Sequence, residues 1–239
     1  MGNFMKAELY KLMKSKSLKV IALLIAFLNI TSATVIMVYD KIEYNGIQTI
    51  DSIVSDIFMY VGIFAAIVFA SDYNDGTARQ YIYRGMTRTS IYFGRLFSII
   101  LVSLIFPVVS FVCYTLPLTI RYGYGDIGES VAVYVARIVI SVIAAVTTYV
   151  LFTLLIAILT RSSGISVAIV CVCTTMIPTI LALADLFKQT NYSQYWLSAM
   201  FSSFMDVANK IELKYVGIIA ALIVGLTTIE CVAYNKQEV

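Results

Sequence analysis

Residues 57–109 read IFMYVGIFAAIVFASDYNDGTARQYIYRGMTRTSIYFGRLFSIILVSLIFPVV, and two apolar runs flank a polar stretch. The polar stretch, 72–95, holds four arginines, two aspartates, three glycines and three threonines. About 20 helical residues are needed to cross a bilayer core of about 30 Å. This alternation therefore predicts two membrane-spanning helices joined by a polar loop.

The whole chain continues this pattern. Its 239 residues are 60% hydrophobic and 13% charged, whereas soluble domains carry about a quarter charged residues. Six apolar blocks reach the length of a membrane span, and a soluble domain of this size could not bury them all. Backbone groups cannot meet water in lipid, so we expect helices. The sequence predicts a single-domain (1–239), all-α polytopic membrane protein with spans at 20–38, 53–70, 96–119, 131–159, 165–187 and 215–233.

The distribution of charge predicts the orientation. With the N-terminus inside, the inner segments hold eleven lysines and arginines and the outer segments hold six, whereas five acidic residues lie inside and nine outside. Lys and Arg are enriched in cytoplasmic loops. Both termini are therefore expected in the cytoplasm, with 72–95 in the largest cytoplasmic loop. The first apolar block has no cleavage site after it, which indicates a retained span.

An amphipathic arm, 3–17, precedes the first span. Four apolar residues share one helical face: Met5, Leu9, Leu12 and Met13. Three lysines lie off that face: Lys6, Lys11 and Lys14. The pattern predicts a helix on the inner leaflet with its lysines near anionic headgroups, and a plain positive-inside arm is the alternative.

A second amphipathic segment, 191–210, precedes the last span. One helical face carries Tyr192, Tyr195, Trp196, Ala199, Met200, Ser203 and Phe204. Aromatic residues concentrate at membrane interfaces, so we expect an interfacial helix on the outer face, with Tyr192, Tyr195 and the only tryptophan, Trp196, at headgroup depth. The alternative is that this segment lines a substrate exit.

Small residues and prolines mark the packing of the spans. Small residues recur at every fourth position of the second span (Gly62, Ala66, Ala70) and of the sixth (Gly217, Ala221, Gly225). This spacing lets helices approach closely, either within one chain or between two. Proline removes a helical hydrogen bond, so kinks are expected at Pro107, Pro117 and Pro178.

Several chemistries lack the residues that they need. The chain has no histidine, which removes Ser-His and Cys-His pairs and HExxH metal sites. No GxxxxGK[ST] loop is present, so the chain itself is not expected to bind or hydrolyse ATP. The cysteines are predicted to be small buried apolar residues. The intramembrane charges all fall near predicted span ends, where they can reach the interface: Asp56, Arg137, Asp185 and Glu230.

The polar stretch resembles the permease subunits of type-2 ABC exporters. Those carry an acidic residue and Gly-Thr-hydrophobic-Arg after the second span. A Pro-x-Ser/Thr-Arg segment then opens a short helix that leads through Gly-Lys into the third span. The first motif is matched by Asp75, Gly76, Thr77 and Arg79, and the second by Thr87, Arg88, Gly94 and Arg95. Gly85-Met86 replaces the proline, aspartate replaces the glutamate, and Arg95 replaces the lysine.

The resemblance implies a coupling helix pressed into a separate ABC ATPase. It also implies that 3–17 is an elbow helix, and that two permeases pair, here as a homodimer with two ATPase copies. ATP and Mg²⁺ would bind to the ATPase, and no cofactor to this chain. The expected ATPase-coupling residues are Asp75, Gly76, Thr77, Arg79, Thr87, Arg88, Thr89 and Ser90. Thr87 is also a favourable helix N-cap, since its hydroxyl can accept a first-turn N–H.

Short outer loops make the chain similar to exporters of amphipathic peptides, such as the phenol-soluble modulin exporter, or to bacteriocin immunity transporters. The spans offer no charged cavity for a polar cargo. We therefore expect the permease subunit of an ATP-driven exporter of toxin-, modulin- or bacteriocin-like peptides in a bacterial plasma membrane. The alternatives are an ABC permease for lipids, drugs or sodium, an ion-coupled secondary transporter, and a membrane anchor without a transport role.

Overall fold

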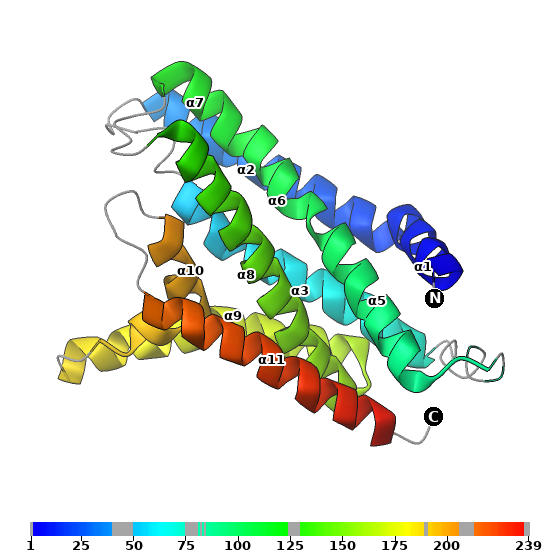
Figure 1. Ribbon diagram of the computed structural model, residues 1–239. Coiled ribbons are helices and arrows are strands. Elements are labelled where there is room, and N and C mark those ends of the chain that lie inside the picture. The colour runs from blue at the N-terminus through cyan, green and yellow to red at the C-terminus, as the bar shows by residue number, and fades with distance from the viewer. Residues whose placement is uncertain are drawn as a thin grey trace.

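The computed structural model describes residues 2–39, 50–74, 81, 83, 85–123, 130–188, 191–205 and 213–236. Within these ranges the chain is helical and contains no strand (Figure 1). The helices are α1 (Gly2–Lys14), α2 (Lys16–Tyr39), α3 (Ile50–Asn74), α5 (Arg88–Ser103), α6 (Ile105–Ser110), the π-helix η1 (Phe111–Thr115), α7 (Leu116–Tyr122), α8 (Val131–Thr160), α9 (Ser163–Lys188), the 3₁₀-helix η2 (Ser193–Tyr195), α10 (Leu197–Met205) and α11 (Leu213–Lys236).

Five helical stretches of the described residues are long and apolar enough to cross a membrane. They are Lys16–Tyr39, Arg88–Tyr122, Ala132–Thr160, Ser163–Lys188 and Lys214–Lys236. The helix α3 lies where the second span is predicted, and its apolar part in this set, Ile57–Ser71, is shorter. The all-helical, multi-span architecture is confirmed, while the count of six spans stays a prediction.

The core surrounds α3, which packs mainly against α8 and α9. A Cβ added at Gly62 would lie 2.6 Å from Val170 Cγ1 of α9 and 3.2 Å from Thr153 Oγ1 of α8. Ala66 and Ala70 are fully buried on the same side. The predicted seam of the second span therefore packs inside the chain. The seam of the sixth span differs, since a Cβ at Gly217 would meet nothing within 4 Å.

The third span changes geometry at its prolines. The helix is interrupted at Leu104, between α5 and α6. Pro107 explains this interruption, because it has no N–H for the carbonyl of Ser103 and its ring crowds that carbonyl. The π-helix η1 ends two residues before Pro117. Both irregularities agree with the predicted kinks.

The segment before the last span is helical in two pieces rather than in one. Trp196 has an extended backbone with ψ 146°, which separates η2 from α10. The Asp185 carboxylate accepts hydrogen bonds from the backbone N–H groups of Tyr192 and Ser193, both at 2.7 Å. The buried face of α10 is made by Leu197, Met200, Phe201 and Phe204. The predicted single face from Tyr192 to Phe204 was therefore wrong, because the break at Trp196 changes the register.

Candidate functional site

The N-terminal end of α5 carries the described half of the predicted coupling residues. Thr87 has φ −71° and ψ 145°, and its Oγ1 accepts a hydrogen bond from the Ser90 N–H at 3.4 Å. Thr89 Oγ1 donates to Thr87 Oγ1, also at 3.4 Å. The predicted N-cap at Thr87 is confirmed. Thr87 and Thr89 are exposed, whereas Arg88 and Ser90 are partly buried.

A tight turn leads into this cap. Gly85 has φ +83°, and the Met86 N–H donates to the Tyr81 carbonyl at 3.2 Å. A backbone bond across a left-handed glycine ends many helices, and Tyr81 and Tyr83 are helical. The side chain of Tyr83 is 87% exposed. Tyrosine is enriched at protein interfaces, so Tyr83 is a further candidate contact beside the predicted coupling residues, and the sequence motifs do not include it.

The start of α5 is packed directly against α1. A Cβ added at Gly94 would lie 2.7 Å from Phe4 Cε1, so glycine allows the two helices to touch here. The buried residues of α1 are Phe4, Glu8 and Leu12. The predicted apolar face is therefore only partly buried by protein, and Met13 on its far edge is 51% exposed. The three predicted headgroup lysines, Lys6, Lys11 and Lys14, are exposed.

A buried polar cluster strengthens this contact. The Tyr81 hydroxyl donates to Glu8 Oε1 at 3.3 Å, and the Arg95 guanidinium carbon lies 5.9 Å from the centre of the Tyr81 ring. The rings of Phe4 and Tyr81 meet edge to face at 4.9 Å. Burial raises the pKa of Tyr81, and the nearby Glu8 carboxylate raises it further. The predicted motif residue Arg95 is thus a buried connection between α5 and the turn before it.

The same end of α5 is also tied to α11. The Tyr92 hydroxyl donates to Glu230 Oε2 at 2.8 Å, and Arg88 Nη1 donates to the Asn235 carbonyl at 3.1 Å. Tyr234 lies against Tyr92, with ring centres 5.8 Å apart. Glu230 is fully buried in the chain. Its predicted placement at the interface was therefore wrong, because it packs inward to meet a tyrosine 138 positions earlier in the sequence.

These contacts place α1, the start of α5 and the end of α11 at one end of the bundle (Figure 1). The first motif lies outside the described residues: Asp75, Gly76, Thr77 and Arg79. Of the predicted interfacial aromatics, Tyr192 and Tyr195 are exposed and Trp196 is partly buried. Their depth in a membrane stays a prediction.

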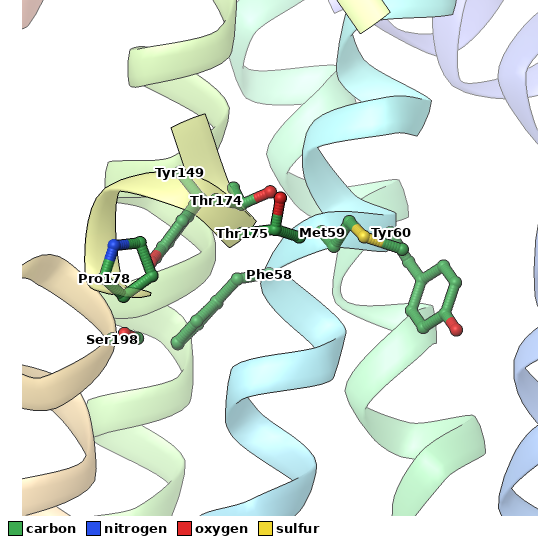
Figure 2. Close-up of a pocket in the computed structure, with 8 residues that line it drawn as sticks. All are labelled: Phe58, Met59, Tyr60, Tyr149, Thr174, Thr175, Pro178 and Ser198. Carbon is green, nitrogen blue, oxygen red and sulfur yellow. The ribbon is translucent and has the colours of Figure 1, made fainter. Parts of the chain in front are cut away.

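A cavity of about 310 Å³ lies between spans in another part of the bundle (Figure 2). Its lining comes from α3, α8, α9 and α10, through Phe58, Met59, Tyr60, Tyr149, Thr174, Thr175, Pro178 and Ser198. No lysine, arginine, aspartate or glutamate is among these eight residues. The cavity offers aromatic rings and hydroxyl groups to a ligand, without a formal charge.

No three His, Cys, Asp or Glu side chains of the described part of the chain gather as metal ligands would. Cys113, Cys171, Cys173 and Cys231 are free thiols of intermediate burial.

Comparison with known families identifies the architecture. Residues 4–177 match the profile described as ABC-2 family transporter protein. The match begins at Phe4, which contacts Gly94, and ends at the residue before Pro178. It covers well over half of the chain and includes the start of α5. No curated protein matches the sequence. The chain belongs to the ABC-2 family of transporter proteins.

Proposed function

We propose that this protein is the permease subunit of an ATP-driven exporter that moves amphipathic peptides out across a bacterial plasma membrane. Its family makes it a multi-pass membrane permease of an ABC transporter, and ATP hydrolysis lies in a separate ABC ATPase subunit. The export direction, the peptide cargo and the plasma membrane are the proposed parts.

The single observation that carries the coupling role is the capped start of α5, which is exposed at its tip and anchored at its sides. Thr87 and Thr89 offer hydroxyls at the surface. Gly94, seven residues after Thr87, contacts Phe4 of α1. Arg88, directly after Thr87, donates a hydrogen bond to the Asn235 carbonyl of α11. A displacement of this tip by the ATPase would be passed to three helices together. The capped helix transmits it because α5 is continuous from Arg88 to Ser103.

The coupling residues are proposed to act as one docking surface. Thr87, Arg88, Thr89 and Ser90 form its described part, and Asp75, Gly76, Thr77 and Arg79 are proposed to complete it. The exposed ring of Tyr83 adds an apolar contact to this surface. Two such permeases, paired as a homodimer, would hold two ATPase copies, in which ATP and Mg²⁺ bind.

The cargo proposal is supported by the composition of the cavity. A charged substrate would lose its hydration in a cavity that has no charged lining side chain, which is costly. An amphipathic peptide can present apolar side chains there instead. This favours amphipathic peptides over sodium, and the family favours an ATP-driven mechanism over an ion-coupled one.

The coupling proposal is tested by substitution in a reconstituted complex of the permease with its ATPase. Thr87→Ala removes the cap, and Arg88→Ala removes the bond to α11. Each is expected to reduce peptide-stimulated ATP hydrolysis and peptide export several-fold. Thr228→Ala is the matched control, since Thr228 is an exposed threonine of α11 that bonds only its own helix.

Co-purification shows whether the complex still assembles. A complex that assembles normally with Thr87→Ala and Arg88→Ala and keeps wild-type stimulation of ATP hydrolysis would refute the docking surface.

The cargo is tested in the same preparation by the class of molecule that stimulates ATP hydrolysis. Stimulation by lipids or drugs, with none by amphipathic peptides, would replace the peptide proposal with that alternative.

A further inference from the structure

We infer that the cavity between α3, α8, α9 and α10 is a binding site for one apolar residue of a peptide together with its neutral amide group. This inference rests on the proposed function, and it names the part of the cargo that is recognised. It follows from the shape of the cavity, its unused hydrogen-bonding groups and its lack of charge.

The apolar side of the cavity is built by stacked rings. Phe58 of α3 and Tyr149 of α8 are parallel, with centres 4.1 Å apart and an interplanar angle of 7°. The ring of Phe201 of α10 lies against Phe58, with centres 5.8 Å apart and an interplanar angle of 54°. Phe58 and Tyr149 are almost completely buried, so packing fixes their positions, and only the small part of each ring that reaches the cavity can meet a ligand. A rigid apolar side of this kind suits an apolar side chain.

The polar side supplies hydrogen-bond donors. Among the described residues, the hydroxyls of Tyr149 and Ser198 have no hydrogen bond to the protein, and both residues line the cavity. Figure 2 shows the hydroxyl end of Tyr149 and the side chain of Ser198 near Pro178, whereas the ring of Tyr60 points away from them. Two hydroxyl donors near one apolar wall can bind the carbonyl oxygen of an amide.

The same cavity supplies acceptors from α9. Thr174 Oγ1 donates to the Val170 carbonyl at 2.8 Å, and Thr175 Oγ1 donates to the Cys171 carbonyl at 2.7 Å. Both hydroxyl oxygens therefore keep only acceptor capacity toward a ligand. Pro178 has no N–H, so the Thr174 carbonyl receives no helical bond from that position. Donors and acceptors are thus both available, as the C=O and N–H of one amide require.

The volume indicates how much of a peptide the cavity can receive. The cavity holds about 310 Å³ and is partly open to its surroundings, which leaves room for a single side chain with its amide.

The site is closed on one side by α10, which brings Ser198. The Asp185 carboxylate holds the entry to this segment through the backbone of Tyr192 and Ser193. Trp196, the only tryptophan of the chain, lies two residues before Ser198. Trp196 is not among the eight lining residues, and its fluorescence serves as an intrinsic reporter from the residue that adjoins α10.

The test uses the full-length permease alone in nanodiscs. The probe is N-acetyl-4-bromophenylalaninamide, whose bromine quenches tryptophan fluorescence at short range. Saturable quenching of Trp196 is expected. Since one hydrogen bond contributes a modest net free energy, Tyr149→Phe and Ser198→Ala should each raise the Kd by about 3- to 10-fold. Thr174→Leu fills the cavity and should abolish saturation, whereas Thr179→Leu, an exposed threonine of the same helix, should not change the Kd.

Two further arms identify the bound chemistry. 4-Bromotoluene has the ring without the amide, and it should quench weakly and equally in wild type, Tyr149→Phe and Ser198→Ala. Equal affinity of both probes, unaffected by these variants, would overturn amide recognition. Nanodiscs with brominated acyl chains test occupation by lipid. Lipid quenching of Trp196 that Thr174→Leu removes, but Thr179→Leu does not, would assign the cavity to lipid and overturn the inference.

The binding test and the test of the proposed function can fail independently of each other. No ATPase is present in the binding test, so absent binding with intact peptide-stimulated ATP hydrolysis in the complex rejects only the cavity site. Binding without any peptide stimulation rejects the exporter proposal and leaves the site. Helical circular dichroism and a monodisperse elution profile show that each variant is folded.

Discussion

At the residue scale, the turn before α5 depends on the backbone conformation of Gly85. Its φ of +83° is a left-handed conformation that costs L-residues with a Cβ roughly 1–2 kcal/mol. A Cβ added there would meet nothing within 4 Å. The penalty of a substitution at this position is therefore one of backbone conformation alone, without a clash.

We predict that Gly85→Ala lowers the free energy of unfolding by about 1–2 kcal/mol. Gly164→Ala is the matched control. Gly164 lies in α9, also has open space around a new Cβ, and has no positive φ. Its replacement should be neutral or stabilise the helix. Thermal unfolding in detergent compares the two, and equal midpoints would show that the turn does not depend on glycine.

The Tyr92–Glu230 pair makes a second prediction at this scale. Among the described residues, Oε1 of Glu230 has no hydrogen-bond partner, so the Tyr92 hydroxyl satisfies the buried carboxyl group through Oε2 alone. Tyr92→Phe removes that donor and should lower the free energy of unfolding by about 1–3 kcal/mol.

The control for this pair is the double variant Tyr92→Phe with Glu230→Leu. It removes both polar partners at similar volume, so it should recover most of the lost stability. Chemical unfolding of both variants measures the difference. A double variant less stable than Tyr92→Phe alone would show that the carboxyl group is held by other contacts.

At the scale of elements, the arm α1 is attached to α5 through a glycine contact. Gly94→Ala would place a Cβ 2.7 Å from the Phe4 ring. We expect a loss of about 1–3 kcal/mol from this overpacking. Phe4→Leu in the same chain should relieve the clash, so the two substitutions should not be additive. A double-mutant cycle by thermal unfolding checks this, and additive losses would refute the contact.

Local sequence rules were sufficient for the elements but not for their pairing. The predicted spans 131–159 and 165–187 agree closely with α8 and α9, because apolar runs with polar ends define helices in lipid. The cap at Thr87 was also predictable, since capping depends on neighbouring residues. The buried face of α1 could not be predicted. Both lipid and protein accept apolar side chains, so hydropathy alone does not show which of the two covers a given face.

Two of the missed contacts of the candidate site share one physical cause. Tyr92 bonds Glu230, and Tyr81 bonds Glu8, across 138 and 73 positions of sequence. Each carboxyl group is polar in isolation and is buried only because a distant tyrosine meets it. Tyr83 was missed for the opposite reason, since only the turn at Gly85 shows that its ring is left exposed.

At the scale of the whole molecule, the orientation in the membrane can be tested directly. In a variant with the four native cysteines replaced, Tyr83→Cys should be protected from an impermeant thiol reagent in intact cells. Gly125→Cys, in a predicted outer loop, should be labelled. Positive-inside placement gives this expectation, and the opposite labelling pattern would reverse the predicted topology.

The contact between Phe4 and Gly94 also sets an order of events during synthesis. Ninety residues separate the two partners, and at about 5–20 residues per second the ribosome needs roughly 5–18 s to make them. Throughout that interval α1 has been synthesised but has no α5 against which to pack. Its exposed lysines and apolar edge can hold it on the membrane surface meanwhile. The arm is thus translated before the third span and reaches its final position only after that span has been made.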